Sequence, residues 1–265
     1  MIKLKESERT RLLKYLLTEP EINTFFIGVI ENHCIDSDEV SVYAEENTEN
    51  DSWNIVVLKY YENYILYSFE DNYQLEELVD FLKEDVVDSI NGKADIVRRI
   101  APFFPHMKVE EKAILRLDNL NDISFENGKV KVRLLSPDDA NRIIDLYAKN
   151  IDHESDFISN RENYVAERRT NLENDGIAVG LMYKRRLVSV AEISTDNDLT
   201  GLIVGIATHP KYYGRGFATQ ATSALCAEAF RRGTKHICAL HDNPKVMNLL
   251  KNIGFEEKSR YALLH

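Results

Sequence analysis

The most informative stretch of the sequence reads Leu202-Ile-Val-Gly-Ile-Ala-Thr-His-Pro-Lys-Tyr-Tyr-Gly-Arg-Gly-Phe-Ala-Thr219. Its first part is apolar and rich in β-branched residues, which predicts a strand that ends near Thr208. Gly214 and Gly216 then precede a long predicted helix. The free amides and positive dipole end of a helix start attract anions, and glycine lets the backbone approach a phosphate closely. The stretch therefore predicts a pyrophosphate cradle, to which Arg215 adds a positive charge.

Three other interpretations of this Gly-Arg-Gly triplet can be compared. Such a triplet before a helix is often only a tight turn. A P-loop is excluded because no Gly-Lys-Ser/Thr ending follows the glycines. A dinucleotide-binding fingerprint is excluded because its glycines come directly after the strand, whereas residues 208–213 intervene here.

Periodic patterns on both sides of the triplet predict two domains that each mix helices and strands. In the second half they predict strands at residues 130–134, 177–183, 187–194, 199–208, 236–240 and 255–264, and helices after Ser136 and at 163–172, 217–232 and 245–252. In the first half they predict helices at 12–17, 75–83 and 94–100 and strands at 40–44, 53–60, 64–69 and 112–117. A polar segment at 120–129 separates the halves, so we place one domain at 1–124 and the other at 125–265.

The second half resembles the GNAT superfamily of acetyl-CoA-dependent N-acyltransferases at two motifs. The cofactor signature Q/R-x-x-G-x-G/A follows a strand that ends in h-x-V/T-x-P. Ile206-Ala-Thr-His-Pro210 matches the strand end, and Tyr213-Gly-Arg-Gly-Phe-Ala218 matches the loop, with Tyr213 in place of Gln or Arg. The pattern N-x-x-A-x-x-L-Y-x-x-x-G-F is similar to Asn243-Pro-Lys-Val-Met-Asn-Leu-Leu-Lys-Asn-Ile-Gly-Phe255. The resemblance implies the GNAT fold, a mixed central sheet flanked by helices, and the first half resembles a degenerate copy of it, as in tandem members.

The resemblance also implies acetyl-CoA as co-substrate, without a metal. The amides of residues 214–219 would hold the pyrophosphate, and the strand end would pair with the pantetheine arm like an added strand. Asn243 would meet the arm near its thiol, although it can equally be a helix N-cap. The cofactor-binding residues implied in this way are Ile206, Ala207, Thr208, Tyr213, Gly214, Arg215, Gly216, Phe217, Ala218, Thr219 and Asn243.

The catalytic residues are less evident. Acyl transfer from a thioester to an amine needs a base for the amine, a stabilised oxyanion and an acid for the thiolate. The positions of the superfamily's usual acid and of its strand glutamate hold Leu250 and Leu202 here. Glu192 and His241 are the candidates that remain. Glu192 can instead be a carboxylate at the surface or rim of the sheet, and His241 a hydrogen-bonded loop histidine.

Taken together, these patterns predict a cytoplasmic enzyme that transfers an acetyl group from acetyl-CoA to a primary amine of a small molecule or peptide. An acyl-CoA-binding sensor without turnover and a tandem-fold aminoacyl transferase stay open as alternatives. The net charge of −11, concentrated in the first half, disfavours nucleic acids and would attract a cationic amine. No apolar run approaches the ~20 residues of a membrane span. The three scattered cysteines fit a reducing compartment and are expected to be buried.

Overall fold

The computed structural model describes residues 1–47, 49, 52–122, 130–150, 160–174, 176–194 and 200–265. The chain forms two compact units. The first comprises Met1–Ile114, Leu240–Asp242 and Glu257–His265, and the second comprises Leu115–Ala239 and Asn243–Glu256. The boundary expected between residues 124 and 125 lies outside the described residues. The final strand of the chain is counted with the first unit.

The first unit is a mixed sheet with helices on both faces. Its strands follow the order β1 (Ile2–Lys3), β2 (Val40–Glu46), β3 (Trp53–Tyr60), β4 (Asn63–Tyr67), β5 (Ser89–Lys93) and β12 (Glu256–Leu264). Its helices are α1 (Arg9–Leu16), α2 (Thr24–Asn32), α3 (Leu75–Lys83) and α4 (Ala94–Ile100). Side chains alternate along a strand, so Val56 and Leu58 pack with α1 and α2, whereas Ile55 and Val57 pack with α3 and α4. A further strand, β6 (Val109–Leu117), leads out of this unit.

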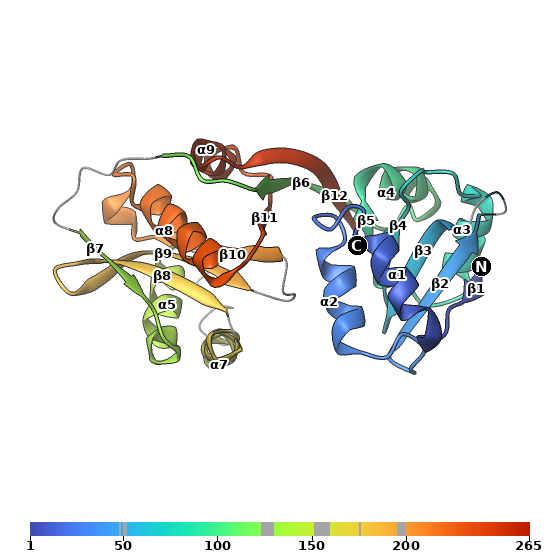
Figure 1. Cartoon of the computed structure of the whole chain (residues 1–265), viewed down its shortest axis with the longest axis horizontal. Helices are drawn as coiled ribbons and strands as arrows, with labels where there is room; N and C mark the ends of the chain where they lie inside the picture. The colour runs from blue at the N-terminus through green and yellow to red at the C-terminus, as the bar shows by residue number, and fades with distance from the viewer. Residues whose placement is uncertain (48, 50–51, 123–129, 151–159, 175, 195–199) are drawn as a thin grey trace. The chain divides into compact units, whose positions relative to one another are not determined.

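The second unit carries the predicted cradle. Strands β7 (Val130–Leu134), β8 (Ile177–Tyr183), β9 (Arg186–Ser194) and β10 (Thr200–Thr208) pair antiparallel in this order, and β11 (His236–His241) pairs parallel with β10. The helices are α5 (Ala140–Tyr147), α7 (Arg161–Glu173), α8 (Phe217–Arg232) and α9 (Pro244–Ile253). Helices α5 and α7 lie on one face of β8–β10, and α8 covers the other (Figure 1).

Most predicted elements are confirmed, and the helix expected at 217–232 has the bounds of α8. Helix α2 and strands β1 and β5 were not predicted. The sequence of α2 is apolar on nearly every side, and β5 is a short polar strand, so neither has a clear period. Cys226 and Cys238 are buried as expected, but Cys34 is exposed. Among the described residues, none of the helices is both long and apolar enough to cross a membrane.

Candidate active site

The loop between β10 and α8 has the backbone that its glycines predict. Gly214 and Gly216 adopt φ angles of +73° and +72°, in the left-handed region that side chains with a Cβ avoid. A Cβ added to either glycine would meet no described atom within 4 Å, so the space above the loop is open. Gly216 is the N-cap of the 16-residue α8, and as a glycine it has no side chain that could cap this helix start. Its first amides can therefore bind an anion, as residues 214–219 are expected to do.

Aromatic rings pack together around Tyr212, next to the glycine loop. The Tyr212 ring stacks on Phe217, with 6.0 Å between centroids, and meets Tyr183 edge-on at 5.7 Å. His209 contacts the same ring at 5.6 Å, and the Arg215 guanidinium lies 5.4 Å from its centroid. The Phe217 side chain is buried at the start of α8, and Ala218 and Thr219 follow it in the first turn. These contacts fix the conformation of the loop, to which Arg215 itself belongs.

The surroundings of the loop are positively charged. Burial lowers the pKa of His209, and the charges of Lys149, Lys211 and Arg186 lower it further. Since three cations act on one half-buried side chain, the field there favours an anion. The chemistry of this loop thus fits a phosphate group.

One detail of the motif assignment is wrong. When Gly214 and Gly216 are the glycines of Q/R-x-x-G-x-G/A, its first position falls on Lys211 rather than on Tyr213. A cation therefore stands at that position, in keeping with an arginine. Tyr213 is 59% exposed, and its hydroxyl donates a hydrogen bond to Oδ1 of Asn150, shortly after α5.

Strand β10 offers backbone to a ligand beside the loop. It pairs with β11 at residues 200–202, opposite residues 236–238. Residues 203–206, which include Ile206, are partly exposed. Ala207 and Thr208 are buried at the strand end, where the hydroxyls of Ser189 and Thr208 lie 2.7 Å apart. An extended ligand arm can add to such an exposed strand by backbone hydrogen bonds.

Asn243 is the N-cap of α9. Its Oδ1 accepts a hydrogen bond of 2.9 Å from the backbone N–H of Lys245, and Pro244 occupies the first helical position. The capping role is confirmed.

Glu192 is fully buried on β9, so the interpretation as a surface or rim carboxylate is wrong. The Tyr147 hydroxyl, at the end of α5, donates a hydrogen bond of 2.8 Å to Oε1 of Glu192. Nε of Arg168, on α7, lies 3.2 Å from Oε2. Burial raises the pKa of Glu192, and Arg168 and Tyr147 act in the opposite direction. Burial also raises the pKa of Tyr147 well above its ordinary value.

His241 is the last residue of β11 and is counted with the first unit, whereas Glu192 lies in the second. Nδ1 of His241 lies 3.7 Å from a carboxylate oxygen of Asp242. Burial lowers the pKa of His241, although Asp242 acts against this. Leu250 and Leu202 are both buried, as apolar residues at these positions should be.

Neither the contacts of Tyr147 and Arg168 with Glu192 nor the role of Gly205 was predicted from the sequence. A glycine inside a strand often marks a bulge or a close approach. The pairing of β10 with β9 shifts register between Ile203 and Gly205, which is such a bulge. That glycine was the available signal.

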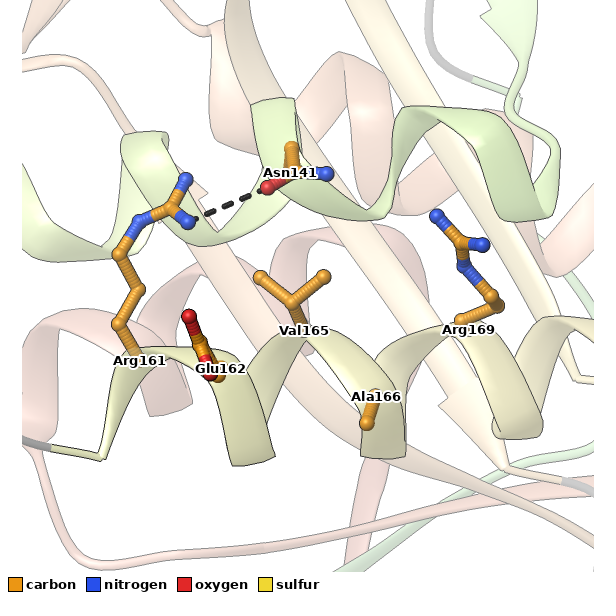
Figure 2. A pocket seen from close by; sticks show the side chains of 6 residues that line it. All are labelled: Asn141, Arg161, Glu162, Val165, Ala166 and Arg169. Atoms are coloured by element: carbon orange, nitrogen blue, oxygen red, sulfur yellow. Dashed lines mark hydrogen bonds between the residues drawn. The ribbon is translucent and has the colours of Figure 1, made fainter.

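Two depressions formed by described residues of the second unit contain none of the predicted site residues. One pocket of about 350 Å³ lies between α5 and α7, and Figure 2 shows Arg161 reaching across it to Asn141 at 3.2 Å. Another, of about 510 Å³, is lined by Met182 and five cations: Lys131, Arg133, Arg142, Lys184 and Arg185. Both pockets are open surface depressions.

In the first unit, the side chains of Glu6, Cys34 and Asp36 come together with ligand atoms within 4.8 Å of one another. The single S–H of Cys34 lies between carboxylate oxygens of Asp36 and Glu6, each 3.1 Å from Sγ, and hydrogen bonding to these carboxylates raises the pKa of Cys34. The cluster is thus held by its own hydrogen bonds.

Comparisons with known proteins agree with this geometry. Residues 141–255 match the model of the acetyltransferase (GNAT) family. No curated protein matches the sequence. A Drosophila protein of solved structure has a TM-score of 0.63 at 14% identity, over 99% of this chain and 97% of its own. A GCN5-related N-acetyltransferase from Kribbella flavida has a TM-score of 0.58 at 14% identity, over 100% and 96%. A tandem GNAT protein from the clavulanic acid biosynthesis pathway has a TM-score of 0.59 at 10% identity, over 99% and 96%. The predicted GNAT fold, with two GNAT-like units, is confirmed.

Proposed function

We propose that this chain, which matches the GNAT acetyltransferase family over residues 141–255, transfers an acetyl group from acetyl-CoA to a primary amine. The observation that carries the proposal is the loop between β10 and α8. There, two glycines in the left-handed conformation lie at the start of α8, which no N-cap side chain covers. The surroundings of this helix start are positively charged. Bound acetyl-CoA supplies the acetyl group as an activated thioester.

The cofactor-binding roles follow from the chain's own groups. The amides of residues 214–219 bind the pyrophosphate, and Lys211 and Arg215 add positive charge. The backbone of residues 206–208 receives the pantetheine arm, and an amide of this segment stabilises the oxyanion. The NH₂ group of Asn243 donates to the arm while its Oδ1 caps α9.

His241 is the candidate base for the amine. Its pKa is lowered, so its ring is neutral at pH 7 and can accept a proton. It stands two residues before Asn243 in the chain. Glu192 is fully buried and hydrogen-bonded, so it influences the reaction through its neighbours and does not take the amine proton directly.

The acceptor class follows from charge. The acidic first half attracts a cationic amine by electrostatic steering, whether a small molecule or a peptide. We place the enzyme in the cytoplasm.

A second candidate function, an acyl-CoA-binding sensor without turnover, is favoured by the buried Leu250 and Leu202 at positions where proton-transferring side chains are expected.

Release of CoA thiol from acetyl-CoA in the presence of an amine panel separates these functions. The panel should contain polyamines, amino sugars, amino acids and peptides with a free N-terminus. Thiol release that depends on one amine supports the transferase. Binding of acetyl-CoA without amine-dependent release by any panel member supports the sensor and argues against the transferase.

A further inference from the structure

A buried ionisable cluster links α5, α7 and β9 on the face of the sheet opposite α8. Glu192 of β9 accepts a hydrogen bond of 2.8 Å from the Tyr147 hydroxyl. The Nε atom of Arg168 lies 3.2 Å from the other carboxylate oxygen, and its guanidinium carbon lies 5.7 Å from the centroid of the Tyr147 ring. We call these three residues the Glu192 cluster.

The stability of the fold does not by itself explain why a buried glutamate occupies position 192. Ala191 and Ile193, on either side of Glu192, are buried apolar residues, and an apolar residue at 192 would avoid the cost of burying a charge. The cluster is also incompletely satisfied. The Nε–H of Arg168 lies within ion-pair distance of Oε2 without pointing at it, so both atoms are buried without a hydrogen bond among the described residues. Buried polar groups of this kind occur preferentially where function requires them.

The cluster interlocks with the bulge of β10 at Gly205. A Cβ at this position would collide with the Tyr147 hydroxyl and would lie 3.3 Å from Oε1 of Glu192. The phenol therefore occupies the space that a side chain of residue 205 would fill. The register shift between Ile203 and Gly205 leaves Val204 as the extra residue of the bulge, and Val204 is 41% exposed. Residues 206–208, the proposed cofactor-binding backbone, follow directly.

We infer that Tyr147, Glu192 and Arg168 are positioning residues that fix this bulge, and with it the direction of the backbone amides that act on the thioester. The inference rests on the proposed function. Glu192 orients the Tyr147 phenol by accepting its hydrogen bond. The phenol packs against Gly205 and so fixes the bulge. The bulge in turn determines the direction of the next three residues of β10. The cofactor's phosphates bind at the loop beyond Thr208, which the cluster does not touch. Loss of the cluster should therefore reduce turnover far more than it weakens acetyl-CoA binding.

Tyr147→Phe tests this step, because it removes one hydroxyl and keeps the ring. We expect the dissociation constant of acetyl-CoA, measured by calorimetry, to stay within about twofold, and kcat for CoA release to fall by about tenfold or more, since small displacements of reacting groups are costly. Gly205→Ala, which displaces the phenol, should have the same effect. Glu192→Gln keeps an oxygen that accepts the Tyr147 hydrogen bond, and it should retain more activity than Tyr147→Phe. Tyr61→Phe, at an exposed tyrosine of the first unit, is the matched control and should match wild type.

The outcomes separate this inference from the proposed function. If the wild-type protein binds acetyl-CoA and turns it over, and Tyr147→Phe has the wild-type kcat, only the positioning role is overturned. A parallel loss of kcat and acetyl-CoA affinity in Tyr147→Phe would also overturn it, because a general structural defect explains that result. If the wild-type protein does not bind acetyl-CoA, the proposed function fails, and the inference fails with it.

Discussion

The Nδ1 atom of His209 accepts a hydrogen bond of 3.2 Å from the backbone N–H of Lys211, at the turn that leads from β10 into the glycine loop. This bond requires an unprotonated Nδ1, and it places the imidazole beside the positive charges that lower its pKa. His209 is therefore a natural reporter of an anion bound at the loop.

We predict that CoA raises the pKa of His209, because the phosphates offset the charges of Lys149, Lys211 and Arg186. An NMR titration of the imidazole signals with and without CoA measures the change. Assignment comes from His209→Asn, which keeps an acceptor for the backbone N–H. Pantetheine, which has no phosphate, is the control and should leave the pKa unchanged. Binding of CoA with an unaltered His209 titration would mean that the phosphates lie elsewhere.

Lys211→Gln should weaken CoA binding through the lost charge alone, because the backbone turn is retained. For an exposed ion pair we expect a loss of about two- to fivefold at low salt, which shrinks as ionic strength rises. Lys235→Gln, an exposed lysine beyond the other end of α8, is the matched control. Equal affinities of the two variants at low salt would remove Lys211 from the site.

Asn243 combines a structural and a binding role, and two variants separate them. Asn243→Ala removes the N-cap of α9 and should lower the free energy of unfolding by about 1 kcal/mol, whereas Asn243→Ser keeps a capping oxygen and should lose less. Both variants lack the NH₂ donor, so both should bind acetyl-CoA more weakly than the wild type. If the serine variant bound acetyl-CoA like the wild type, the donor role would be wrong and only the cap would remain.

Asp139 anchors the start of α5 and should give stability a specific pH dependence. Burial tends to raise its pKa, but the Ser136 N–H and the guanidinium groups of Arg133 and Arg142 lower it overall. A lowered folded-state pKa means that the carboxylate stabilises the fold above its unfolded pKa of about 3.9, and that this contribution disappears as the pH falls through the folded value.

Asp139→Asn should therefore lower the free energy of unfolding by about 1–3 kcal/mol at pH 7. The deficit relative to wild type should shrink from about pH 4 downward. Urea unfolding at several pH values measures both quantities, with the exposed Asp138→Asn as control. A deficit that is the same at pH 7 and pH 3 would show that the charge of Asp139 is not its source.

The elements around the glycine loop could be predicted because their signals are local. Gly216 and Gly233 both adopt left-handed conformations at the two ends of α8, so the sequence itself marks where the helix begins and ends. Asn243 and Pro244 mark the start of α9 in the same way. Residues that begin or end a helix in this way can be recognised without knowledge of the tertiary structure.

The environment of Glu192 could not be predicted, because it depends on residues far away in the chain. Its hydrogen-bond donor, Tyr147, stands 45 positions earlier, and the space for that phenol exists only because residue 205 is glycine. A carboxylate within a strand more often faces solvent. For this reason the sequence left open that Glu192 lies at the surface or rim of the sheet. The final strand differs, because an open edge has to be covered, and its partner β5 does lie in the first half of the sequence.

The central claim is that the loop at residues 214–219 binds acetyl-CoA, and calorimetry with two glutamate variants tests it most directly. Gly216→Glu places a bulky anion in the open space above the helix start, whereas Gly233→Glu makes the same substitution, at a similarly left-handed glycine, at the other end of α8. Both variants carry a comparable backbone strain of about 1–2 kcal/mol. We predict that the wild type and Gly233→Glu bind acetyl-CoA and that Gly216→Glu does not. A wild-type protein that fails to bind, or a Gly216→Glu variant that binds like the wild type, would contradict the assignment of this loop as the cofactor site.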